Sequence, residues 1–226
     1  MDTQLDRRRT FNPEKPARGR GATYTCAMKF PGEELVAMLV AVSFAAGLNV
    51  YATVATLGLL AHTGVFALPP GLHLLASWYV IAASGALFVV EFFADKIPAF
   101  DLLWNALHTF IRVPIAALLA YQATAALSPG ERLLATLVGG AIALAAHGGK
   151  TAARAIVTPS PEPFSNITLS LGEDVVAVFL TWMSTVQPVW AISIVMALLL
   201  LIVLMVRWVL RAMRSLFKGA EQERAH

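Results

Sequence analysis

Residues 35–60, LVAMLVAVSFAAGLNVYATVATLGLL, form a long apolar run without a charged side chain. Roughly 20 apolar helical residues cross the hydrocarbon of a bilayer, so the run predicts a membrane-spanning helix. Gly47 and Asn49 lie near its middle, where glycine weakens a helix and a buried amide needs a hydrogen-bonding partner. Two interpretations stay open: a broken helix whose freed backbone groups and Asn49 line a site, or a close helix–helix contact in which Asn49 bonds to a neighbour.

The rest of the chain continues this pattern. Of its 226 residues, 58% are hydrophobic and 14% are charged, whereas soluble domains carry about 25% charged residues. We therefore predict an all-α fold, a polytopic transmembrane helix bundle of about six spans. The predicted spans lie at 35–60, 72–94, 102–127, 133–156, 169–187 and 188–209. The predicted domains are a disordered basic tail at 1–31, a membrane domain at 32–212 and a cytoplasmic basic tail at 213–226.

Basic residues gather at the two ends of the chain. Seven of the 17 Lys and Arg residues precede the first predicted span, and five lie at or beyond the end of the last, from Arg207 onward. The positive-inside rule then places both termini in the cytoplasm of a multi-pass protein of the bacterial cytoplasmic (inner) membrane. The expected partner of the basic tails is the anionic lipid of the bilayer, not a nucleic acid. A homo-oligomer is left open. The single cysteine, Cys26, excludes an internal disulfide.

Ionisable residues inside the apolar segments are the strongest functional signal. A charge in hydrocarbon costs from ~2.5 to more than ~10 kcal/mol unless it pairs, reaches water or does chemistry. The residues predicted to form a polar core or binding site are Asn49, Glu91, Asp95, His108, Arg112, His147, Lys150, Arg154, Asn166, Glu173 and Asp174.

The order of these charges along the chain suggests how they pair. Acids precede bases around the second and third spans, and bases precede acids around the fourth and fifth. We expect Glu91 and Asp95 to face Lys150 and Arg154. By the same reasoning, Arg112 is expected to face Glu173 or Asp174, which lowers the desolvation cost of each member.

A weak internal repeat accompanies this pattern. A shift of 61 residues aligns Pro98 with Pro159 and Arg112 with Glu173. Few positions are identical, so chance similarity stays open as the alternative. Two related units would be repeated about an axis along the membrane normal.

Several strings resemble one known family. EFFADKIPAFD at 91–101, LHTFIR at 107–112 and KTAARAIVTPSPEPFSNITLSLGEDVVAV at 150–178 resemble an uncharacterised family of bacterial polytopic membrane proteins, the domain of unknown function number 4126. The AGLNVY stretch at 46–51 fits as well. The resemblance covers about 35–190 and implies an integral inner-membrane protein. It implies no activity and no role for any residue.

Three classes of function remain. The first is movement of a small ion or polar solute through the charged core, with His108 and His147 as proton relays. The second is an intramembrane enzyme or a protein that handles lipid phosphates, with Arg112, Lys150 and Arg154 holding the phosphate. The third is a membrane scaffold. No cofactor or metal motif is found. No catalytic residue is assigned, because Ser165, Ser170 and Thr109 do not establish a triad by spacing.

Overall fold

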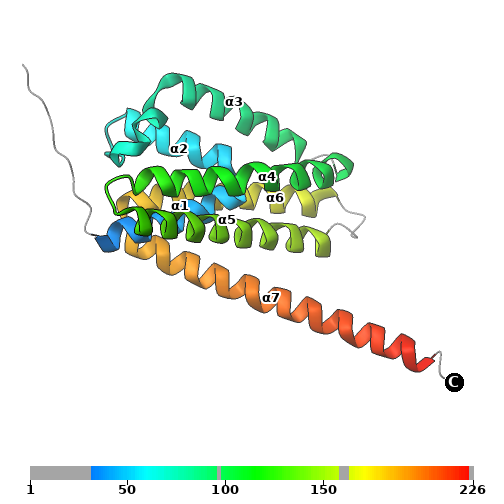
Figure 1. Ribbon diagram of the computed structural model, residues 1–226. Helices are drawn as coiled ribbons and strands as arrows, with labels where there is room; N and C mark the ends of the chain where they lie inside the picture. Colours follow the sequence, from blue (N-terminus) through cyan, green and yellow to red (C-terminus); the bar gives the residue numbers. More distant parts are fainter. Residues whose placement is uncertain (1–31, 96–97, 158–162, 224–226) are drawn as a thin grey trace, which may run out of the picture.

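The computed structural model describes residues 32–95, 98–157 and 163–223 (Figure 1). The side chains at 98–106, 155–157, 163–166, 212, 213 and 215–223 are outside this description. Within the described residues all regular structure is helical, which confirms the all-α prediction. The elements are α1 (Gly32–Leu48), α2 (Val50–His62), η1 (Pro70–Ala76), α3 (Trp78–Ala94), α4 (Pro98–Ala123), α5 (Pro129–Val157), α6 (Pro163–Val186) and α7 (Pro188–Glu223).

Proline marks where the four long helices begin. Pro98, Pro129, Pro163 and Pro188 are the first residues of α4, α5, α6 and α7. Proline suits this position because its fixed φ is helical and its missing N–H has no partner there anyway. Before α5, Ser128 and Glu131 also form a capping box, in which the Ser128 N–H donates to Glu131 Oε2 at 3.0 Å. The sequence thus fixes these boundaries locally.

Helix α1 occupies the centre of the bundle. It packs against α4, α5, α6 and α7, and Figure 1 shows α4 to α7 running in alternating directions around it. Small side chains permit the close packing: Ala41, Ala45 and Ala46 are fully buried. A Cβ at Gly47 would collide with the backbone of Ala143 in α5. Alanine and glycine therefore let the tip of α1 approach α5 closely.

The apolar run at 35–60 does not form one straight helix. Asn49 is extended, with φ −148° and ψ 103°, and it separates α1 from α2. Helix α2 turns back toward the end of the bundle where α1 begins (Figure 1). Buried side chains from the start of α1 and the end of α2, such as Met38 and Leu57, share one apolar cluster. The two helices therefore form a V whose tip, Leu48-Asn49, lies inside the bundle.

Three helical segments are long and apolar enough to cross a bilayer among the described residues: Pro129–Arg154, Ile167–Val186 and Pro188–Arg211. The pair Pro70–Ala76 and Trp78–Ala94, bent by 67°, would be a fourth. The chain is thus a multi-pass membrane protein, but the prediction of about six spans is not confirmed. Apolar content predicts burial in lipid, and it does not show whether a segment crosses or turns back, as α1 and α2 do.

The described ends of the chain also bear on orientation. Helix α1 begins at the end of the bundle where α7 begins, and α7 ends at the opposite end (Figure 1). The prediction that both termini lie in the cytoplasm is therefore not confirmed. The prediction of a disordered tail at 1–31 lies outside the described residues.

Candidate functional site

Seven charged side chains are buried around the tip of the V. Each is at most 8% exposed. They are Glu91, Asp95, Arg112, Lys150, Arg154, Glu173 and Asp174. A buried ion is costly unless an opposite charge and hydrogen bonds compensate it. The partners of these seven groups therefore decide what the site can do.

Four of them form what we call the four-charge cluster: Asp95, Lys150, Arg154 and Glu173. Asp95 is the C-cap residue that follows α3, the two bases lie in the last part of α5, and Glu173 lies in α6. Lys150 Nζ lies 3.1 Å from Asp95 Oδ2 and 3.1 Å from Glu173 Oε2. Arg154 Nη2 lies 3.0 Å and 2.8 Å from the same two oxygens. Each base therefore touches both acids, which confirms the predicted pairing of Asp95 with Lys150 and Arg154.

A second set, the Arg112 chain, links α3, α4 and α5. Arg112 forms a salt bridge with Glu91, and both side chains are fully buried. Its Nη1 lies 2.9 Å from His147 Nδ1, and His147 Nε2 lies 2.7 Å from Thr109 Oγ1. Because a guanidinium can only donate, Nδ1 must accept and Nε2 carries the proton that bonds to Thr109. These two hydrogen bonds are therefore those of a His147 that is protonated at Nε2.

The predicted partner of Arg112 was wrong. Arg112 contacts Glu91 and His147 in place of Glu173 or Asp174. Glu91 correspondingly bonds to Arg112 and not to Lys150 or Arg154. The physical reason is the rotation of the helices about their axes. Glu91 in α3 and Arg112 in α4 project toward each other, so the pair forms between two consecutive helices.

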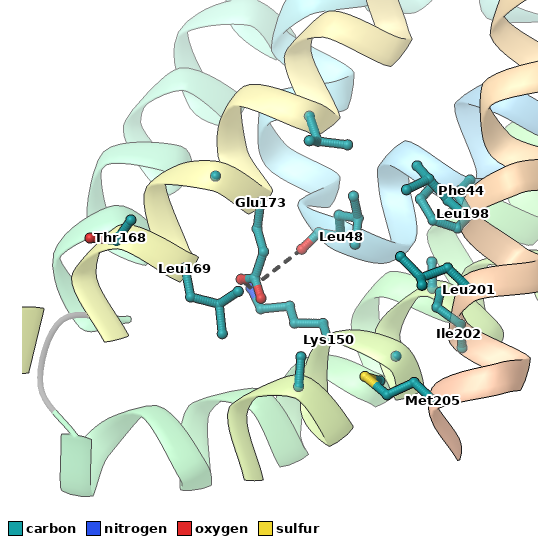
Figure 2. A pocket seen from close by; sticks show the side chains of 15 residues that line it. Phe44, Leu48, Lys150, Thr168, Leu169, Glu173, Leu198, Leu201, Ile202 and Met205 are labelled. Atoms are coloured by element: carbon teal, nitrogen blue, oxygen red, sulfur yellow. Dashed lines mark hydrogen bonds and ion pairs between the residues drawn. The ribbon is translucent and has the colours of Figure 1, made fainter. Parts of the chain in front are cut away.

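The tip of the V joins both sets. Asn49 Nδ2 donates to Asp174 Oδ1 at 2.8 Å, and Asn49 Oδ1 accepts from the Ala52 N–H at 2.9 Å. Lys150 Nζ also lies 3.4 Å from the Leu48 carbonyl oxygen. Figure 2 shows this carbonyl directed at the meeting point of Lys150 and Glu173. The structure shows the close helix contact at Gly47 and the bond from Asn49 to a neighbouring helix, and it also shows a broken helix whose polar groups face the charged core.

The remaining predicted residues divide into two groups. His108 is 3% exposed, and its Nε2 lies 3.4 Å from the Tyr51 hydroxyl of α2. Asn166 lies in α6, and its side chain is outside the described residues. Tyr51 and Thr109 were missed as partners of the histidines. Tyr51 could have been predicted as a partner, because it lies two residues after Asn49 in an apolar segment and a buried hydroxyl needs a hydrogen-bond partner.

The sequence of the chain matches one protein family. Residues 36–208 match the family model for a domain of unknown function, DUF4126. The chain belongs to the DUF4126 family. No curated protein and no solved structure matches it. The matched range includes all seven buried charges of this DUF4126 protein.

The charges of the core do not balance. Among the described side chains, four buried carboxylates accompany three buried Lys and Arg groups. Asp174 forms no ion pair with any described residue; its Oδ1 receives the Asn49 amide, and its Oδ2 has no hydrogen-bond partner there. Glu91 Oε2 and Asp95 Oδ1 are likewise buried without a partner among the described side chains. With all seven groups ionised, these described side chains together have one negative charge in excess.

Neither a metal-ligand group nor a catalytic triad is formed by the residues that the structure describes. The described residues contain no group of three or more His, Cys, Asp or Glu placed to hold a metal ion. Thr109 and His147 form a hydroxyl–imidazole pair, but Arg112 lies where a nucleophilic site needs an acid to orient the base. Ser170 is fully buried, and the side chain of Ser165 is outside the description.

An apolar cavity reaches the four-charge cluster from the side. It has a volume of about 790 Å³ and lies between α1, α5, α6 and α7. Leu201, Ile202 and Met205 line its outer part, and Lys150 and Glu173 meet at its inner end (Figure 2). The charged core is therefore next to a space large enough for an apolar molecule.

Proposed function

We propose that this DUF4126 protein moves a small monovalent cation across the bilayer through the charged core at the tip of the V. The observation that carries the proposal is an excess of negative charge among the described side chains: four buried carboxylates accompany three buried Lys and Arg groups. An unpaired carboxylate in a membrane interior is costly and favours uptake of a cation or a proton. The same carboxylates would repel an anion.

The position of Lys150 supports a cation over a neutral solute. Its ammonium group lies within 3.1 Å of two carboxylates and 3.4 Å from the Leu48 carbonyl. Carboxylate and carbonyl oxygens are the ligands that hard cations take. A mobile cation and the lysine thus compete for the same oxygens, and withdrawal of Lys150 makes room for the ion. Broken helices present backbone carbonyls to cations in the same way in membrane transporters.

Flux into proteoliposomes tests the proposal. We expect uptake of at least one of H⁺, Li⁺, Na⁺ or K⁺ by the wild type and a loss of about tenfold or more in Asp174→Asn. Asparagine keeps an oxygen that can accept the Asn49 amide, so the variant removes charge with little change in shape. Glu33→Gln is the matched control, because Glu33 is an exposed carboxylate in the first turn of α1.

Two results would overturn the proposal. The first is no flux of any of the four cations through correctly inserted protein. The second is an Asp174→Asn variant as active as the wild type. Lys150→Gln adds a direct measurement: without the competing ammonium, Na⁺ or K⁺ should raise the melting temperature more than in the wild type, at an ionic strength held constant with choline chloride.

A second candidate function, binding of a lipid chain, is favoured by the cavity in Figure 2. Its walls are mainly aliphatic, which suits an acyl chain. A phosphate head group is disfavoured there, because Asp95 and Glu173 already flank the Lys150 charge and would repel it. Filling the cavity with Gly149→Leu should displace bound lipid, measured by mass spectrometry of the purified protein. If the charges only lock the helices together, neither flux nor specific lipid binding will be observed.

A further inference from the structure

An aromatic groove lies on the opposite face of α6. It has a volume of about 450 Å³ and is formed by α3 and α6. Helix α2 packs against both of these helices and so forms the support behind the groove. Phe88 and Phe92 contribute from α3, and Phe179 and Trp182 contribute from α6. This volume is within the range of about 300 to 1,000 Å³ that is typical of small-molecule sites.

Of the described residues that line the groove, one is charged: Asp174. Asp174 is 4% exposed, and its Oδ2 has no hydrogen-bond partner among the described residues. It is also the only member of the seven buried charges that forms no ion pair with a described residue. The wall of an otherwise apolar groove thus holds a carboxylate that has no ion-pair partner among the described residues.

Four aromatic side chains that line the groove can also attract a cation. Phe88 and Phe92 have ring centroids 6.2 Å apart, and Phe179 and Trp182 have centroids 6.1 Å apart. Aromatic faces attract cations, most strongly where water is excluded. Trp182 and Phe179 are 42% and 41% exposed on the outer surface, so the groove is accessible from the lipid.

We propose that the groove between α3 and α6 binds a lipophilic organic cation, such as a quaternary ammonium or phosphonium compound, with Asp174 as its counter-ion and the four aromatic rings around it. This inference rests on the proposed function for the excess negative charge and extends it by naming a class of substrate. An apolar molecule with one positive charge satisfies both the rings and the carboxylate. A lipophilic anion would face Asp174, and a neutral molecule would leave the carboxylate uncompensated.

Equilibrium dialysis of the full-length protein in detergent provides the test. Tetraphenylphosphonium is the probe, and tetraphenylborate is its matched control, because the two ions have nearly the same shape and opposite charge. We expect saturable binding of the cation only. Asp174→Asn should weaken it by about tenfold or more, and Phe92→Leu by about threefold to tenfold. Leu201→Ala, in the other cavity, and Glu33→Gln should bind as the wild type does.

The inference is overturned if tetraphenylborate binds as tightly as tetraphenylphosphonium, or if both Asp174→Asn and Phe92→Leu bind the cation as the wild type does. Trp182→Leu provides a further groove variant if Asp174→Asn does not fold. Binding and flux separate the two proposals. Saturable tetraphenylphosphonium binding without any inorganic cation flux refutes the proposed transport and leaves the groove assignment intact. Inorganic cation flux without saturable tetraphenylphosphonium binding supports the transport and refutes the groove assignment.

Discussion

The Arg112 chain and the four-charge cluster solve the same problem in different ways. Among the described residues, Glu91 and Arg112 form one ion pair with no exposure, and His147 accepts a further hydrogen bond from the arginine. In the four-charge cluster each base contacts both acids. Loss of Arg112 therefore leaves Glu91 without a described cation, whereas loss of one acid from the cluster leaves both bases in contact with the other acid. The comparison teaches that the same buried charge has a different structural cost depending on how many partners it has.

The largest effect is expected in the Arg112 chain. Arg112→Gln leaves Glu91 charged and buried without its cation, which should cost about 3 to 5 kcal/mol of stability. Thermal unfolding followed by size-exclusion chromatography in detergent measures the change. Arg211→Gln, at an exposed position of α7, is the matched control.

The double variant Glu91→Gln with Arg112→Gln sharpens this prediction. Because it removes both charges, it should recover much of the loss. A double variant that is no more stable than Arg112→Gln alone would show that the ion pair does not account for the loss.

The four-charge cluster should tolerate a single change better. In Asp95→Asn both bases keep Glu173, so we expect a loss of about 1 to 3 kcal/mol, measured by the same assay. The comparison breaks down if Asp95→Asn destabilises the protein as much as Arg112→Gln does.

A smaller effect is expected where no charge is involved. Tyr51→Phe removes the hydroxyl that faces His108 Nε2 and keeps the ring, which lies edge-on to the imidazole with centroids 5.7 Å apart. The expected loss is about 0.5 to 1.5 kcal/mol, typical of one neutral hydrogen bond. A loss as large as that of Asp95→Asn would place His108 among the charged groups.

The last prediction concerns topology and not stability. The four-charge cluster lies toward the end of the bundle where α3 and α5 end, and α1 begins at the opposite end (Figure 1). The side of the membrane on which α1 begins therefore also tells which side the cluster is nearer. In a Cys26→Ser background, cysteines at Glu33→Cys and Gln222→Cys should react with an impermeant maleimide from opposite sides. Reaction from the same side would support the orientation that the basic tails predict and contradict the V of α1 and α2.

Part of the charged core could be predicted from the order of residues alone. Asp95 pairs with Lys150 and Arg154 as expected, because an acid at the end of one helix and bases near the end of another can meet at one level. The partner of Arg112 could not be predicted in this way. Which residue it faces depends on the rotation of α3 and α4 about their axes, which packing of the whole bundle sets.

The sequence by itself determined that the chain is helical, that it is embedded in a membrane, and that its charges must be buried together. These properties follow from apolar content and from the cost of an isolated charge in lipid, and neither depends on three-dimensional detail. Only the tertiary structure decided that residues 35–60 turn back at Asn49, because an extended residue reverses the chain only where a partner such as Asp174 holds it. Only the tertiary structure, too, placed Asp174 without an ion pair among the described residues, because the rotation of α6 directs Glu173 to the bases and Asp174 to the groove.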